Sequence, residues 1–198
     1  MNIEDNLITI QEKLRQTKRE GIEEFIAYLD TTDFMSAPAS TKFHLNVLGG
    51  LMQHSLNVLR FAEEINKSTE ADIPEESIIL GALLHDICKI NYYELGEEWD
   101  KEHKDKTNQW RKKSVWKVND QEPLGHGEKS AILASKYIDL TTDELAAIRW
   151  HMGFSEPGVN FGYPTGQPFR ESLNRYPLVK IVMLGDQMAE LYETANNS

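Results

Sequence analysis

Apolar residues recur with helical spacing along most of the chain. In residues 3–16, Ile3, Leu7, Ile10 and Leu14 form one stripe, which is the pattern of an amphipathic helix. A similar spacing returns in later segments, where an apolar side alternates with a polar one. We therefore expect further helices over 20–30, 50–66, 74–90, 127–137, 142–152 and 177–193.

One segment breaks this helical pattern. Residues 91–122 place aromatic and β-branched residues on both sides of a charged, turn-rich centre, which predicts a β-hairpin. Between Lys101 and Lys113 there are six Lys or Arg residues and two acids, a local charge of +4. This charge is typical of a solvated hairpin tip, and it also fits a basic flap over an anionic substrate.

The predicted fold class is all-α, a helical bundle with one inserted β-hairpin. Residues 31–45 contain Pro38 and small polar residues, and residues 153–170 are rich in Gly and Pro, so we expect loops there. A chain of 198 residues is long enough for one domain. We expect N-terminal helices within 1–32 to pack on a core domain formed by 33–198.

Composition narrows the classes of partner and compartment. The 21 basic and 32 acidic residues give a net charge of −11, which disfavours duplex nucleic acid and anionic membranes. No apolar run approaches the ~20 residues of a membrane helix, and the N-terminus has no signal-peptide core. The single cysteine, Cys88, excludes an internal disulfide, so we expect a cytoplasmic protein. The tryptophans of the predicted hairpin would suit a contact between two copies of the chain, as in a homo-oligomer.

Histidines and acids lie on or beside the apolar helices. His54 is on the apolar side of the 50–66 segment, and His85 and Asp86 follow the run IILGALL. A buried carboxylate needs a partner because removing its water is costly. Taken singly, each residue is more typical of a hydrogen-bonded core position. Together, four histidines and two aspartates form a ligand set for one or two divalent metal ions: His54, His85, Asp86, His126, His151 and Asp186.

The order of these residues resembles a known family. His54, the His85-Asp86 pair and Asp186 match the H…HD…D signature of the HD-domain superfamily of metal-dependent phosphohydrolases, within GGLMQHSLNV and GALLHDICK. His126 and His151 extend the match to the binuclear pattern H…HD…H…H…D. In the local sequence around these motifs, the chain is similar to stand-alone HD hydrolases of bacteria and phages and to the HD module of bacterial 3′→5′ exoribonucleases. The resemblance implies an HD-domain helical bundle.

The resemblance also implies a binuclear metal centre. One ion would be held by four side chains: His54, His85, Asp86 and Asp186. The second would share Asp86 as a bridge and take His126 and His151. Such sites accept Mn, Fe, Ni, Co or Zn, and also Mg. Two ions lower the pKa of a shared water and neutralise phosphate charge, so hydrolysis of a phosphoric ester is expected, as a phosphohydrolase or phosphodiesterase.

Cationic residues near the predicted centre are candidate substrate contacts. Lys89 lies one turn after His85 and would contact a phosphate, although a cation is also favoured at a helix C-terminus. Asp86, Lys89 and His44 are the predicted catalytic residues, with His44 binding substrate or protonating a leaving group. Cys88 replaces the Gly of the family's HDxGK; about 200° from Asp86 on a helix, it is predicted to be structural. Further candidate substrate contacts are Lys42, Arg149 and Arg170.

The expected substrate is a small phosphorylated molecule such as a nucleotide or short oligonucleotide. Two other functions share the fold. An HD-type di-iron oxygenase uses a similar ligand set, and a non-catalytic nucleotide-binding module would keep the fold without turnover. An intact ligand set argues against the non-catalytic module, because a degenerate site usually loses its ligands first.

Overall fold

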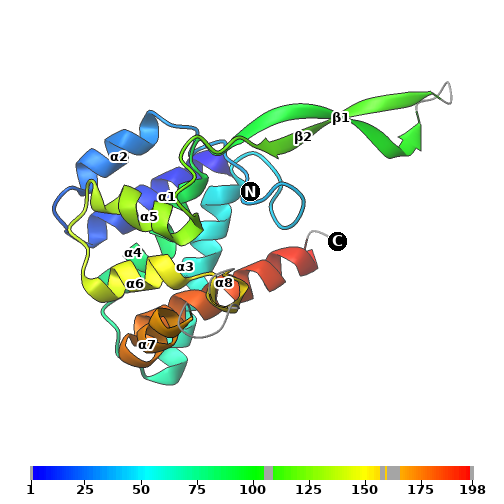
Figure 1. Cartoon of the computed structure of the whole chain (residues 1–198). Coiled ribbons are helices and arrows are strands. Elements are labelled where there is room, and N and C mark those ends of the chain that lie inside the picture. Colours follow the sequence, from blue (N-terminus) through cyan, green and yellow to red (C-terminus); the bar gives the residue numbers. More distant parts are fainter. Residues whose placement is uncertain (1, 105–108, 157–158, 160–165, 197–198) are drawn as a thin grey trace.

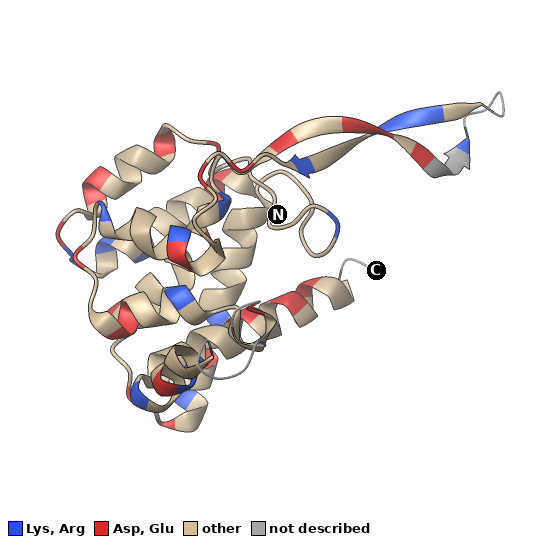
Figure 2. Cartoon of the chain, viewed as in Figure 1, with Lys and Arg blue, Asp and Glu red and all other residues tan. Residues whose placement is uncertain are grey.

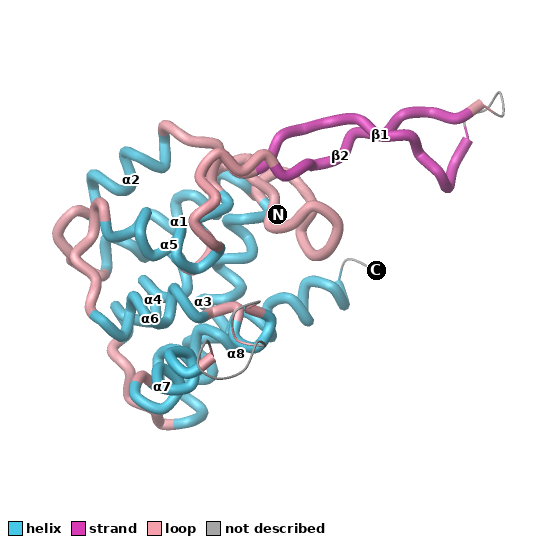
Figure 3. The backbone as a smooth tube through the Cα atoms, viewed as in Figure 1, coloured by secondary structure: helices cyan, strands magenta, loops and turns pink. Residues whose placement is uncertain are grey.

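A computed structural model describes residues 2–104, 109–156, 159 and 166–196. Helices form the body, and a two-stranded antiparallel sheet projects from it, as Figures 1 and 3 show. The predicted all-α fold with one β-hairpin is confirmed. Among the described helices, none combines the length and the apolar character needed to cross a bilayer.

The described helices follow the predicted segments closely at most boundaries. The N-cap of the 142–152 segment is Thr141, whose side chain and that of Glu144 form a reciprocal capping box. The α-helices are α1 (Ile3–Gln16), α2 (Ile22–Asp30), α3 (Gly50–Thr69), α4 (Glu75–Leu84), α5 (His126–Ser135), α6 (Thr142–Trp150), α7 (Gln167–Arg175) and α8 (Pro177–Asn196). Two 3-10 turns are η1 (Ile87–Lys89) and η2 (Gly153–Ser155).

One main core joins the N-terminal helices to the rest of the chain. Leu14 of α1 and Phe25 of α2 are fully buried in the same apolar cluster as Leu80 of α4 and Val182 of α8. α3 and α8 pack against each other, and α4 packs on both (Figure 1). The expected division into N-terminal helices within 1–32 and a core domain of 33–198 stays a prediction.

Two segment predictions are wrong in detail. The helix expected to reach Ile90 ends at Leu84, and a 3-10 turn follows. The loop expected over 153–170 contains the start of α7, and residues 157–158 and 160–165 of it lie outside the described residues. α7 forms because Pro168 suits a first turn and Phe169 is fully buried against neighbouring aromatic rings.

The hairpin consists of β1 (Tyr93–Lys104) and β2 (Trp110–Val118). Acidic positions of β1 lie opposite basic positions of β2: Glu98 is paired with Lys113 in the register, and Lys112 forms a 3.0 Å ion pair with Glu97 (Figure 2). Because an isolated two-stranded ribbon is marginal in water, these cross-strand pairs help to hold it. Several hairpin side chains are large, apolar and exposed: Leu95, Trp99, Trp110 and Val118.

Two glycines lie at close contacts between helices. A Cβ at Gly127 in α5 would lie 2.1 Å from the backbone oxygen of Arg149, so α5 can approach α6 only because this residue has no side chain. A Cβ at Gly185 in α8 would lie 3.1 Å from the backbone oxygen of Val58 in α3. These two approaches bring the helices that carry the predicted ligands close together.

Replacing Gly127 with Ala tests the α5–α6 approach. The added methyl group meets backbone rather than a movable side chain, so we expect the free energy of unfolding to fall by about 1–3 kcal/mol. Denaturant titration measures the change. Gly96→Ala is the control, because there the added methyl group meets only the flexible side chain of Lys117. Equal stability of the two variants would contradict the packing described.

Candidate metal centre

His85 and Asp86 face the same side because the α-helix ends just before them. His85 is the C-cap of α4, and Asp86 has φ −114° and ψ 15°, outside the helical region. Both residues are buried, with exposed fractions of 0% and 3%. His85 Nε2 lies 3.5 Å from Asp86 Oδ2. In a continuous helix, neighbouring side chains are separated by about 100°. Because the backbone departs from helical geometry at Asp86, the two side chains can face the same side.

His54 and Asp186 meet where α3 packs on α8. His54 Nε2 lies 3.1 Å from Asp186 Oδ1, and the same nitrogen is 3.8 Å from Asp86 Oδ2. His54 Nδ1 lies 3.1 Å from the carboxylate of Glu193, and Asn57 donates to Glu193 Oε1 at 2.7 Å. Glu193 is buried two helical turns after Asp186, so one face of α8 supplies both carboxylates.

His126 and His151 approach Asp86 from the other side. His126 is the first residue of α5 and His151 is the C-cap of α6, the two helices held close at Gly127. His126 Nε2 is 2.7 Å from Asp86 Oδ1, and His151 Nε2 is 3.5 Å from the same oxygen. All six predicted ligand residues thus converge on one region, and both oxygens of Asp86 face ring nitrogens.

The four histidines share one arrangement that fits metal ions. In each ring Nδ1 has a partner other than the two aspartates: the carboxylate of Glu193, the carbonyl oxygens of Ala82 and Ile148 at 2.7 Å each, and the sulfur of Cys88. The Nε2 atoms then point toward the aspartates. Nε2 of His85 and of His151 are buried and form no hydrogen bond among the described residues. A fixed Nδ1 with a free, inward Nε2 is how metal-binding histidines are held.

The ligand atoms fall into overlapping groups. His54, His85 and Asp186 form one group, and His85, Asp86 and His151 form the next, with the ligand atoms of each group within 4.8 Å of one another. A further group joins Asp86, Cys88 and His126. These buried clusters of histidine and aspartate have the composition and spacing to hold divalent metal ions.

Charges inside the cluster are strongly coupled. Burial opposes charge on His54, but hydrogen bonds to Asp186 and Glu193 raise the pKa of its ring to about 10. Burial also opposes charge on His126, yet Asp86 raises the pKa of its ring to about 9. Burial works against ionisation of Asp86 too, but the charge of Lys89, with Nζ 2.5 Å away, keeps the pKa of that carboxyl well below its ordinary value. The cations and carboxylates therefore balance each other in the buried region.

A cavity of about 170 Å³ opens from this cluster toward solvent. His44 and Lys89 line it together with Asp86, and Ser155 and Gln187 lie on its wall. Burial lowers the pKa of His44 to about 4, and neither ring nitrogen of His44 forms a hydrogen bond with the described residues. Its ring lies 4.8 Å from that of His54. The structure thus brings two of the predicted catalytic side chains, His44 and Lys89, beside the ligand cluster.

The other predicted substrate contacts lie elsewhere. Arg149 forms ion pairs with Glu128 and with Glu156, and its guanidinium stacks on Trp150. Arg170 is exposed on α7, and Lys42 lines a second cavity beneath the hairpin. None of the three is among the described residues that line the ligand-cluster cavity. Their predicted contact with substrate stays a prediction.

Two residues at the site were not expected from the sequence. Glu193 supports His54, and its signal was its spacing of seven residues from Asp186. Cys88 was expected to face away from Asp86, which is wrong because the chain is not α-helical there. Its buried sulfur lies 3.4 Å from His126 Nδ1. The sequence HDICK contains no Gly or Pro that would have marked the helix end.

Comparison with known proteins places the chain in a family. A family model for the HD domain matches residues 51–190, most of the chain and all six converging residues. The chain belongs to the HD-domain family, which confirms the resemblance drawn from the sequence. HD domains bind divalent metals, in agreement with the buried clusters. The match supports the predicted class of metal-dependent phosphoric ester hydrolase.

A curated relative adds a more distant likeness. The dihydroneopterin 2′,3′-cyclic phosphate phosphodiesterase of Methanocaldococcus jannaschii is 36% identical over 76 residues. The aligned region is 36% of this chain and covers 30% of that protein's length. No solved structure matches the chain.

Substitution of Cys88 tests its role beside His126. If the sulfur only holds the His126 ring, the Co²⁺-loaded protein will show no sulfur-to-cobalt charge-transfer band in the near ultraviolet. Cys88→Ser, which keeps a polar partner, will then retain Co²⁺ affinity, whereas Cys88→Val will lower it about tenfold or more. Absorption titration measures both properties. A charge-transfer band lost in Cys88→Ser would instead make Cys88 a direct ligand.

Proposed function

We propose that the protein is a metal-dependent phosphodiesterase that hydrolyses a phosphoric ester of a nucleotide or short oligonucleotide. The observation that carries the proposal is the shared orientation of the histidines. Their Nδ1 atoms are held from outside. The Nε2 atoms of His85 and His151 form no hydrogen bond with the described residues, and each lies 3.5 Å from an oxygen of Asp86. In a purely structural core, two buried ring nitrogens without hydrogen bonds would have no explanation, because each such group lowers stability.

The residues divide into two ligand sets. His54, His85 and Asp186 would hold one ion, His126 and His151 the second, with Asp86 bridging both. Bound divalent ions supply a water of lowered pKa and neutralise phosphate charge. Mn, Fe, Co, Ni and Zn all suit histidine and carboxylate ligands, and the proposal covers each of these metals and Mg.

Lys89 and His44 would act on the substrate itself. Lys89 Nζ, held 2.5 Å from Asp86 Oδ2 at the cavity wall, is placed to bind a non-bridging phosphate oxygen and to stabilise charge as it develops there. His44 lines the same cavity; neither of its ring nitrogens forms a hydrogen bond with the described residues, and Nδ1 lies 3.9 Å from Glu190 Oε1. It would donate a hydrogen bond to the leaving-group oxygen. Both roles are catalytic contacts with the reacting ester.

A phosphorylated substrate with a heterocyclic ring is supported by the curated relative. That protein is named for the 2′,3′-cyclic phosphate of dihydroneopterin, a cyclic phosphoric diester of a pterin. The net charge of −11 makes a small substrate, drawn in by local cations and metal ions, a better match than a duplex. A cytoplasmic location and a homo-oligomeric state stay predictions.

Replacing Asp86 with Ala tests the proposed function. Because Asp86 faces both ligand groups, we expect loss of bound metal and a fall in turnover to background, with helical content largely kept. Elemental analysis, circular dichroism and a panel of phosphomonoesters and phosphodiesters with Mn²⁺, Ni²⁺ and Mg²⁺ measure the three properties. Asp139→Ala, at an exposed carboxylate, is the control. Full hydrolysis by the Asp86 variant would contradict the proposal.

A further inference from the structure

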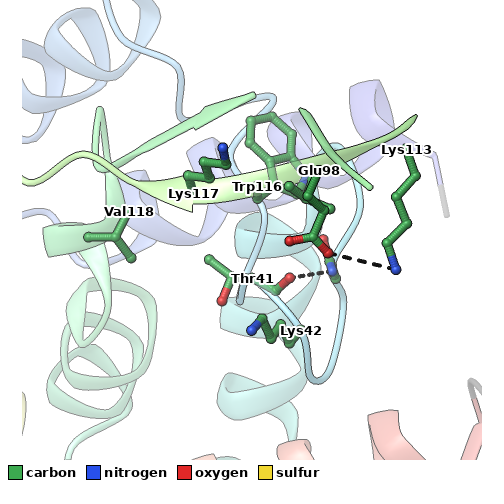
Figure 4. Close-up of a pocket in the computed structure, with 9 residues that line it drawn as sticks. Thr41, Lys42, Glu98, Lys113, Trp116, Lys117 and Val118 are labelled. Atoms are coloured by element: carbon green, nitrogen blue, oxygen red, sulfur yellow. Dashed lines mark hydrogen bonds and ion pairs between the residues drawn. The ribbon is translucent and has the colours of Figure 1, made fainter. Parts of the chain in front are cut away.

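A second cavity lies between the hairpin and the 41–46 segment. It has a volume of about 580 Å³, within the size range of small-molecule sites. Figure 4 shows Thr41 and Lys42 on one side and the β2 residues opposite them. Glu98 of β1 completes the wall. We refer to it as the hairpin cavity.

Positive charge gathers in the hairpin cavity. Lys42, Lys113 and Lys117 line it against a single acid, Glu98, which lies 3.8 Å from Lys113. The described lining thus carries three positive charges and one negative, in a chain whose net charge is −11. A local reversal of sign on an acidic protein concentrates anions at that point.

The two walls of the cavity are held in place by different interactions. Val115, Trp116 and Lys117 of β2 belong to one wall, where Lys117 Nζ donates to the Glu97 carbonyl at 3.2 Å. The opposite wall is ordered by a hydrogen bond that Asn46 donates to the Thr41 carbonyl at 2.6 Å.

The segment that bounds the hairpin cavity also reaches the metal centre. Lys42 lines the hairpin cavity, whereas His44, two residues later, lines the ligand-cluster cavity. Ser40 holds this turn by donating to the His44 carbonyl at 2.8 Å and accepting from the Phe43 N–H at 2.9 Å. One short ordered segment therefore separates the two cavities.

We propose that the hairpin cavity is a substrate subsite. It binds the part of the substrate beyond the scissile ester, with a further phosphate held by Lys42 and Lys113. This inference rests on the proposed phosphodiesterase function and deepens it. The preferred substrate is then a dinucleotide or longer oligonucleotide with a free phosphate, rather than a lone phosphoric ester.

Two neighbouring lysines of β2 provide matched variants. Lys113 lines the cavity, whereas Lys112 pairs with Glu97, lies over Trp99 and is not among the described residues that line the cavity. On the metal-loaded protein, Lys113→Glu should raise KM for the dinucleotide pApA about three- to tenfold relative to Lys112→Glu. KM for bis(4-nitrophenyl) phosphate, which lacks the extra phosphate, should be the same in both variants. Glu98→Gln should lower KM for pApA, and Glu97→Gln should not.

The outcomes separate this inference from the proposed function. Equal KM values for pApA in Lys113→Glu and Lys112→Glu, or an equal rise for both substrates, would overturn the subsite. If the wild-type protein hydrolyses no substrate, the proposed function fails. The subsite is then tested by equilibrium binding of pApA to the protein in a buffer that contains a metal chelator. Weaker binding by Lys113→Glu than by Lys112→Glu supports the subsite. Equal or absent binding overturns it.

Discussion

The burial of Asp86 is the constraint around which the rest of the site is arranged. Only 3% of its surface is exposed, and an isolated carboxylate at such a place would be strongly destabilising. Lys89 offsets part of that cost at one oxygen and His126 at the other. The nitrogens of further histidines lie within 4 Å, each held by its other ring nitrogen. Such a surplus of ligand atoms around one carboxylate is the local chemistry of a metal centre.

Helix packing brings this constellation together from distant parts of the sequence. α3 carries His54, the end of α4 carries His85 and Asp86, and α8 carries Asp186. The absence of a side chain at Gly185 lets α8 approach α3, and the same property of Gly127 lets α5 approach α6. The fold thus supplies short distances between backbones, and the polar residues at those points meet as a consequence. Because a single added methyl group alters such a distance, stability and the site are coupled.

Periodicity and residue type made most of the helices and the six converging residues predictable. A histidine or aspartate inside an apolar run is conspicuous, since these types are seldom buried without partners. The helix end at Leu84 was not predictable, because no Gly or Pro follows before Asn91, which takes a positive φ of 52°. That error also misplaced Cys88. α7 was missed because Gly166 and Pro168 suggested a loop, whereas burial of Phe169 favours a helix there.

The central claim is that these side chains gather to hold divalent cations. Anomalous diffraction from crystals of the protein grown with Mn²⁺ or Zn²⁺ tests it directly. The account predicts ion density on both sides of Asp86, beside Nε2 of His85 on one side and Nε2 of His151 on the other, at about 2.0–2.3 Å from the ligand atoms. Crystals without ion density there, or with imidazole rings turned so that Nδ1 faces Asp86, would contradict it.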